Sequence, residues 1–185
     1  MIRVCDILIS ILVLIIFLPI IFIISVLVFV IDGRPIIYKQ SRIGYKGRKF
    51  IIFKFRTMSK VIFKDEKLRL TSLGKILRRS SLDELPQFIN VLKKDMSIVG
   101  PRPLPEIIEK KINKSIKIKR RKILPGITGM SQINYTGKKR KLNEKIHLDM
   151  EFINDYTIYN YFMILLKTPF ALVIRLFKNK SSIIK

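Results

Sequence analysis

The chain is poor in the side chains that build disulfides and zinc sites. Among its 185 residues there is one cysteine, Cys5, and one histidine, His147. A single cysteine excludes an internal disulfide, and one cysteine with one histidine cannot form a zinc site of the Cys/His type. Any bound metal would therefore have carboxylate ligands, which favours a hard cation such as Mg²⁺.

Acidic residues are also scarce. The 13 aspartates and glutamates face 37 lysines and arginines, which gives a formal net charge of +24. Residues 110–141 contain 12 basic residues and no acidic one. Such a surface attracts either nucleic acid or an anionic membrane. A membrane-tethered nucleic-acid binder and a non-catalytic membrane scaffold are therefore alternatives, but the attached apolar segment favours anionic phospholipid as the partner.

One long apolar run stands near the N-terminus. Residues 7–31 carry no charge, and 25 residues of helix exceed the roughly 30 Å of a bilayer core. The apolar region of a cleaved signal peptide is shorter and is followed by small residues, which this segment lacks. Pro19 lies at the midpoint and predicts a bend, so a re-entrant helix with both ends in the cytoplasm is expected. A kinked spanning helix is the alternative.

The segment after this anchor has the pattern of two short β-strands. Residues 35–38 and 50–53 are apolar, and the polar loop between them contains Gly44 and Gly47, which predicts a β-hairpin. Lys54 and Arg56 follow at its exit and share one side of an extended chain, a geometry suited to binding a phosphate. Solvated lysines that protect a strand edge are the alternative.

Helical patterns fill most of the remaining chain. An amphipathic helix is expected to end at Arg78 and Arg79, a basic helix is expected over residues 104–122, and residues 155–178 favour a pair of interfacial helices divided at Pro169. A buried core helix is the alternative for that last segment. The expected fold is mainly α with a small β-hairpin, divided into a membrane helix over residues 1–33 and a cytoplasmic catalytic domain over residues 34–185.

Two adjacent carboxylates give the strongest indication of chemistry. Asp83 and Glu84 precede apolar residues at helical spacing, with Pro86 in the expected first turn. Both acids would then lie at the positive end of a helix, where phosphates also bind. A capping box formed by Ser81 and Glu84 is the simpler alternative.

Six motifs in order resemble those of the bacterial sugar transferases of the monotopic phosphoglycosyl transferase family. They are the apolar segment with Pro19, residues 54–58 (KFRTM), 81–87 (SLDELPQ), 99–103 (VGPRP), 125–129 (PGITG) and 148–149 (LD). The resemblance covers nearly the whole chain and corresponds to the minimal form of the family.

The resemblance implies transfer of a sugar 1-phosphate from a UDP-sugar to a polyprenyl phosphate such as undecaprenyl phosphate, releasing UMP, at the cytoplasmic face of the bacterial inner membrane. It implies a covalent phosphosugar on Asp83, with Glu84 and Asp83 holding Mg²⁺. It also implies substrate or phosphate binding by a further set of residues, and it leaves a homodimer open. That set is Lys54, Arg56, Arg78, Arg102, Gln132, Asn134, Lys138 and Asp149.

Three positions depart from the family pattern. Leu18 precedes Pro19 where many relatives have serine, and Leu124 replaces an arginine before the PGITG motif. Residues 134–139 (NYTGKK) replace a frequent Asn-Gly-Arg segment, so Lys138 or Lys139 would substitute for a phosphate-binding arginine. Lysine lacks the bidentate fork of arginine, so weaker binding of the nucleotide is expected.

Overall fold

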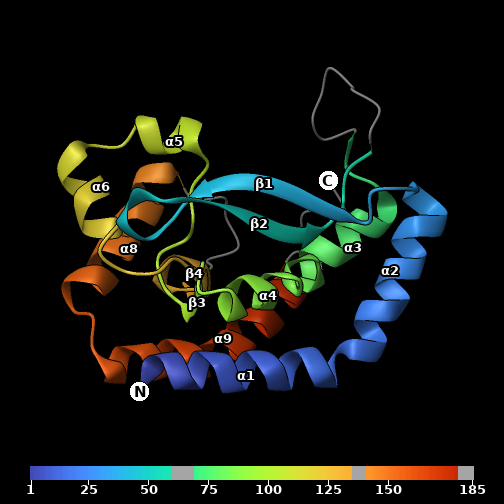
Figure 1. Cartoon of the computed structure of the whole chain (residues 1–185), viewed down its shortest axis with the longest axis horizontal. Helices are drawn as coiled ribbons and strands as arrows, with labels where there is room; N and C mark the ends of the chain where they lie inside the picture. Colours follow the sequence, from blue (N-terminus) through green and yellow to red (C-terminus); the bar gives the residue numbers. More distant parts are fainter. Residues whose placement is uncertain (60–68, 135–140, 179–185) are drawn as a thin grey trace.

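The computed structural model describes residues 1–59, 69–134 and 141–178, and in them helices predominate (Figure 1). The N-terminal half contains α1 (Ile2–Ile16), α2 (Leu18–Asp32), β1 (Ile37–Ile43), β2 (Lys49–Phe55), α3 (Ser72–Ser80), α4 (Gln87–Leu92) and β3 (Ser97–Val99). The C-terminal half contains α5 (Glu106–Lys110), α6 (Lys114–Arg120), β4 (Gly126–Thr128), α7 (Met130–Ile133), α8 (Leu142–Asn154) and α9 (Ile158–Lys178). The expected fold class, mainly α with a β-hairpin, is confirmed at this level.

The predicted hairpin is present and longer than expected. Strands β1 and β2 are antiparallel, with Ile37 opposite Phe55 and Ile43 opposite Lys49. A second, smaller sheet pairs β3 with β4 in parallel and was not predicted, because three-residue strands are too short to display alternation. A side chain at Gly126 would place its Cβ 2.1 Å from the amide nitrogen of Gly100, so this crossing requires glycine.

The N-terminal apolar segment is broken, as predicted, close to Pro19. Helices α1 and α2 meet at Phe17 and are bent by 62°. Pro19 lies in the first turn of α2, because its ring would clash with the carbonyl of Ile15 if α1 continued. By length and composition, the bent pair together and residues Ile158–Phe177 of α9 are each apolar enough to cross a membrane.

Helix α1 is tied to the domain by two charged residues that the sequence did not single out for packing. Asp6 is buried and accepts hydrogen bonds from the Ser97 hydroxyl (3.0 Å), the Ile98 amide (2.8 Å) and the Tyr161 hydroxyl (2.7 Å). Arg3 donates to the carbonyl of Val91 at 2.6 Å, at the end of α4. One side of α1 therefore packs on the domain while its opposite side is apolar and exposed.

Two helix predictions were wrong. The basic helix over residues 104–122 is divided into α5 and α6, because Asn113 caps a new helix by accepting from the Ser115 amide at 3.0 Å. The interfacial pair over residues 155–178 is instead one helix, α9, which continues through Pro169. The Thr168 hydroxyl bonds the Ile164 carbonyl at 2.7 Å beside the interruption, and packing maintains the helix.

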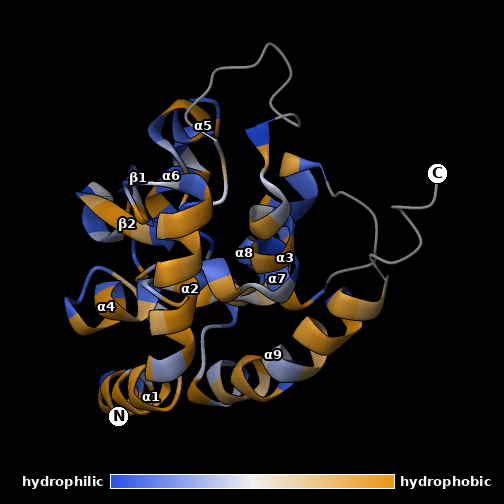
Figure 2. Cartoon of the chain, turned by 90° about the vertical axis from the view of Figure 1, so that its right-hand side faces the viewer, coloured by the Kyte–Doolittle hydropathy of each residue, from blue (hydrophilic) through white to orange (hydrophobic). Residues whose placement is uncertain are grey.

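Helix α9 combines the two alternatives considered for it. Tyr161 and Ile164 are buried in the main core with Ile52, Val91 and Phe152. Its other side exposes large apolar residues, among them Tyr159, Leu166, Phe170, Val173 and Phe177. Figure 2 shows α1 and α9 as apolar ribbons along one edge of the molecule, with α5 at the opposite edge.

Candidate active site

The two adjacent acids lie in a tight turn between α3 and α4. Ser81 ends α3 in the left-handed conformation (φ 59°), residues Leu82–Glu84 form a single 3-10 turn, and Pro86 is the N-cap of α4. The acids therefore precede the helix they were expected to start. The capping box is wrong: the Ser81 hydroxyl accepts from Arg175 at 3.2 Å, and the Glu84 side chain points to other partners.

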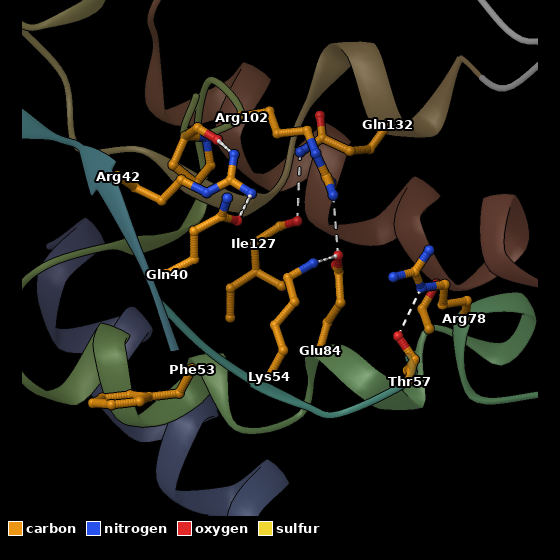
Figure 3. Close-up of polar contacts among 12 residues, drawn as sticks. Gln40, Arg42, Phe53, Lys54, Thr57, Arg78, Glu84, Arg102, Ile127 and Gln132 are labelled. Atoms are coloured by element: carbon orange, nitrogen blue, oxygen red, sulfur yellow. Dashed lines mark hydrogen bonds and ion pairs between the residues drawn. The ribbon is translucent and has the colours of Figure 1, made fainter. Parts of the chain in front are cut away.

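Glu84 is held by two cations from separate elements (Figure 3). Its Oε1 accepts from Lys54 Nζ of β2 at 2.5 Å and from Arg102 Nη2 at 3.1 Å. Burial alone would raise the pKa of Glu84, but Arg102 and Lys54 outweigh it and lower the pKa to about 2. Glu84 is therefore a permanent carboxylate at neutral pH.

Asp83 has the opposite electrostatic environment. Burial and, to a smaller extent, the neighbouring Glu84 charge raise its pKa to about 6, against the opposing influence of Lys54, Arg78 and Arg102. Its carboxylate has no hydrogen bond or ion pair with any residue in the described ranges. Among the described residues, Asp83 is thus a buried carboxyl group without a partner, beside one whose Oε1 binds two cations.

Both acids open onto a cavity of about 570 Å³ between the hairpin, α3 and the end of α9. Of the described residues, two acidic and seven basic ones line it, the basic ones being Arg42, Lys54, Arg56, Arg69, Arg78, Arg102 and Arg175. This excess of positive charge suits a ligand with several negative charges, such as a diphosphate.

The sequence missed three of these basic residues. Arg42 follows Tyr38 and Gln40 at alternate positions of β1, and that period of two was available as a signal. Arg175 reaches the cavity from the far end of the chain, and no local pattern predicts this. Arg69 likewise had no signal in the sequence.

The predicted phosphate-binding residues of this region have different partners. Lys54, Arg78 and Arg102 line the cavity, and Arg78 donates through Nε to the Thr57 hydroxyl at 2.8 Å. Arg56 is buried and donates to the carbonyls of Asp32, Gly33 and Arg34, so its guanidinium is engaged at the end of α2.

Asp149, Gln132 and Asn134, the other predicted residues that the structure describes, do not line this cavity. Asp149 on α8 is buried in an ion pair with Arg120 at 2.5 Å, and Arg120 also donates to the Arg102 carbonyl at 2.7 Å. Gln132 on α7 donates to the Ile127 carbonyl at 3.4 Å, and Asn134 follows the end of that helix. Lys138 and Lys139 lie outside the described residues. Arg120 was not predicted, since its neighbours indicated a solvated basic helix.

The oxygen ligands available to a metal are few. In the part of the chain that is described, no cluster of three or more Asp, Glu, His or Cys side chains has the arrangement of a metal site. The oxygens left over at this turn are the Asp83 carboxylate and Glu84 Oε2, since both cations bind Oε1. Mg²⁺ is commonly bound by one or two protein carboxylates, with water and substrate phosphates as its other ligands.

A family model described as bacterial sugar transferase matches residues 1–175 of the chain. The UDP-glucose:undecaprenyl-phosphate glucose-1-phosphate transferase of Klebsiella pneumoniae is 38% identical to this chain, over 97% of the chain and 41% of that protein. The enzyme of the same name from Escherichia coli (strain K12) is 36% identical, over 96% of the chain and 40% of that protein. The galactosyl transferase CpsE of Streptococcus agalactiae serotype III (strain NEM316) is 38% identical over 74% of this chain and 34% of that protein.

These relatives are longer, and the chain spans about two fifths of their length or less. The match nonetheless extends over nearly all of this chain and includes the turn with Asp83 and Glu84, the hairpin with Lys54 and the loop with Arg102. The chain belongs to the bacterial sugar transferase family.

Proposed function

We propose that this protein transfers a sugar 1-phosphate from a UDP-sugar to undecaprenyl phosphate, producing a polyprenyl-diphosphate sugar and UMP. The names of the matched relatives support both substrates, since two of them act on UDP-glucose and undecaprenyl phosphate. The basic cavity supports the same substrates, because each brings phosphate charge to the acids of the turn. The sugar itself stays unassigned.

The unequal state of the two acids is the observation that carries the proposal. A carboxylate that attacks phosphorus needs an oxygen that no cationic side chain neutralises. Asp83 has no hydrogen bond or ion pair among the described residues, whereas Glu84 is bound by Lys54 and Arg102. Asp83 is therefore assigned as the nucleophile. Glu84 keeps Lys54 and Arg102 beside the phosphates.

The reaction proceeds in two displacements. An Asp83 carboxylate oxygen attacks the phosphorus that carries the sugar, the bridging P–O bond breaks, and UMP leaves with that electron pair. A phosphate oxygen of undecaprenyl phosphate then attacks the same phosphorus, and the bond to Asp83 breaks to regenerate the carboxylate. Arg102, Lys54 and Arg78 stabilise the charge that develops on the phosphoryl oxygens in both steps.

Mg²⁺ is proposed as the metal, held by Asp83 and Oε2 of Glu84. When bound, the ion neutralises diphosphate charge and acts as a Lewis acid at the reacting phosphoryl group. The donor set supports this choice, since it consists of carboxylate oxygens alone.

We also propose that α1 and α2 form a re-entrant membrane helix and that the domain lies on the cytoplasmic face. Both ends of the bent pair are bound to the same domain. Arg3 and Asp6 join the start of α1 to α4, β3 and α9, and Arg56 binds the carbonyls at the end of α2. A bilayer between the two ends would have to separate these contacts. The elbow at Phe17 is then the deepest point of insertion.

The activity is tested by UMP release. Purified protein in detergent, with Mg²⁺ and undecaprenyl phosphate, is given a panel of UDP-sugars, and UMP is measured by coupled luminescence. We expect release with at least one sugar, and we expect EDTA to stop it. If no UMP is formed with a broad panel, including UDP-glucose and UDP-galactose, the proposed function is wrong.

A further inference from the structure

A second cavity, of about 890 Å³, lies at the opposite end of the β1–β2 hairpin from the active site. Its walls are the hairpin turn, the residues after α4, residues 122–124, the start of α1 and Tyr156. In Figure 1 these segments lie on the left of the molecule, between the N-terminus and the hairpin turn. No residue lines both cavities, so the second one is separate from the site of Asp83.

The second cavity is strongly basic. In the part of the chain that the structure describes, seven lysines and arginines line it, namely Arg3, Lys46, Arg48, Lys49, Lys93, Lys94 and Lys122. The two acids in the lining are already engaged, Asp6 by three donors and Asp95 by the Asn90 amide at 3.2 Å. Within the described residues, Lys46, Lys94 and Lys122 form no ion pair. Their mutual repulsion favours an anionic ligand.

Two of these lysines occupy an unfavourable backbone conformation. Lys46 (φ 53°) and Lys94 (φ 67°) are left-handed, and Ser81 of the catalytic turn is the other non-glycine residue with positive φ in the described ranges. Left-handed backbone is unfavourable for a residue with a Cβ, and glycine or asparagine would adopt it more readily. Both lysines line the cavity despite this unfavourable conformation.

The cavity adjoins the apolar edge of the molecule. Val4 follows the lining residue Arg3 in α1, and Ile158 and Tyr159 at the start of α9 follow the lining residue Tyr156 closely in sequence. All three are exposed, with 59%, 46% and 70% of their surface accessible. Tyr156 lines the cavity itself, and tyrosine is typical of the level of lipid headgroups. A basic pocket continuous with an apolar surface matches a ligand that has a charged head and hydrocarbon chains.

We propose that this cavity binds the phosphate of an anionic phospholipid headgroup, with the acyl chains lying along α1 and the start of α9. The bound lipid would orient the domain on the membrane without taking part in the reaction. The proposal rests on the membrane placement of α1 and α9 given above, and it is independent of which sugar is transferred.

The test measures lipid selectivity in nanodiscs with spin-labelled phosphatidylglycerol and phosphatidylcholine. The cavity variant is Lys46→Asn/Lys94→Asn/Lys122→Gln, in which asparagine suits the left-handed backbone. The control, Lys111→Gln/Lys114→Gln/Lys119→Gln, removes the same charge from exposed positions in and around α5 and α6. We expect the wild type and the control to prefer phosphatidylglycerol by roughly 3-fold or more, and the cavity variant to lose most of this preference.

Three outcomes would overturn the proposal. An equal loss in the control would assign the preference to diffuse charge, and no preference in the wild type would exclude a headgroup site. Displacement of the labelled lipid by inorganic phosphate, but not by chloride at equal ionic strength, would indicate a site for small anions instead. If the wild type did not bind to nanodiscs at all, the membrane placement of α1 and α9 would be wrong. The UMP-release assay in detergent would still test the proposed function independently.

Discussion

Asp83 and Glu84 are adjacent in the chain, yet their pKa values are moved in opposite directions, to about 6 and about 2. Burial acts on both, but Glu84 has Lys54 and Arg102 in direct contact and Asp83 has neither. Pairs of acids separated in this way are typical of sites in which the two carboxylates have different roles.

The rate of the first step is expected to rise with pH around pH 6, because only ionised Asp83 attacks phosphorus. Glu84 is ionised throughout this range and contributes no transition there. UMP release in a single turnover, measured from pH 5 to 8 at UDP-sugar concentrations well below saturation, gives the midpoint for the free protein. A rate that is constant across this range would contradict the environment assigned to Asp83.

Removing Arg78 is expected to shift that midpoint upward, since its positive charge lowers the pKa of Asp83. Arg78→Gln should therefore need a higher pH to reach its full rate. Lys75→Gln is the matched control, because Lys75 is an exposed base on the same helix and does not line the cavity. Equal midpoints in the two variants would show that Arg78 does not act on Asp83.

Asp83→Asn is expected to stabilise the fold at neutral pH while it removes activity. The pKa of Asp83 is above its ordinary value of 3.8, so the folded state binds the proton more tightly than the unfolded state does. The contribution of this tighter proton binding to the free energy of unfolding is fully present below pH 3.8 and is lost as the pH rises through about 6. The amide avoids the loss, which amounts to at most about 3 kcal/mol.

Thermal unfolding with EDTA present measures this effect. The variant should melt at a higher temperature than the wild type at pH 8, and the difference should vanish towards pH 4. A variant that is less stable than the wild type at pH 8 would mean that the carboxylate has a stabilising partner in the folded protein.

Neutralising one member of the buried ion pair between Arg120 and Asp149 is expected to destabilise the domain by on the order of 3–5 kcal/mol, because the other buried charge is left uncompensated. Asp149→Asn should show this in chemical unfolding. Arg120→Met/Asp149→Leu removes both charges and should recover much of the loss. If the double variant were no more stable than Asp149→Asn, the pair would not be what holds these helices together.

Local patterns in the sequence predict some parts of this architecture, and contacts between distant segments determine the rest. Alternation and helical spacing are local, so they located the β1–β2 hairpin, the break near Pro19 and the turn of Asp83. Contacts between distant segments have no such signal: Asp6 meets Tyr161 across 155 positions, and Arg175 meets Ser81 across 94. These contacts fix α1 and α9 to the domain.

Packing also overrides local rules. Pro169 predicted the end of a helix, but Tyr161 and Ile164 bury α9 against the core and the helix continues. Arg120 belongs to a basic run that predicted a solvated face, yet it is the one residue of α6 that is buried, opposite Asp149. A charge run indicates average exposure and does not identify the member that turns inward.

The re-entrant placement predicts that both ends of the bent helix pair lie in the cytoplasm. In a Cys5→Ser background, a single cysteine before Met1 and a single cysteine at Lys111 should both resist an impermeant maleimide in spheroplasts and react after lysis. Labelling of the N-terminal cysteine alone from outside would instead show a spanning helix.

The most direct test of the account is the mass of the intact protein after incubation with UDP-sugar and Mg²⁺ but no lipid acceptor. We expect the wild type to gain the mass of one sugar phosphate, peptide mapping to locate it on Asp83, and undecaprenyl phosphate to remove it. Asp83→Asn should gain no mass and should lose turnover by about 1,000-fold or more. An adduct on Glu84 or Asp149 would contradict the assignment of the nucleophile, and UMP release that requires both substrates together, with no adduct, would contradict the covalent mechanism.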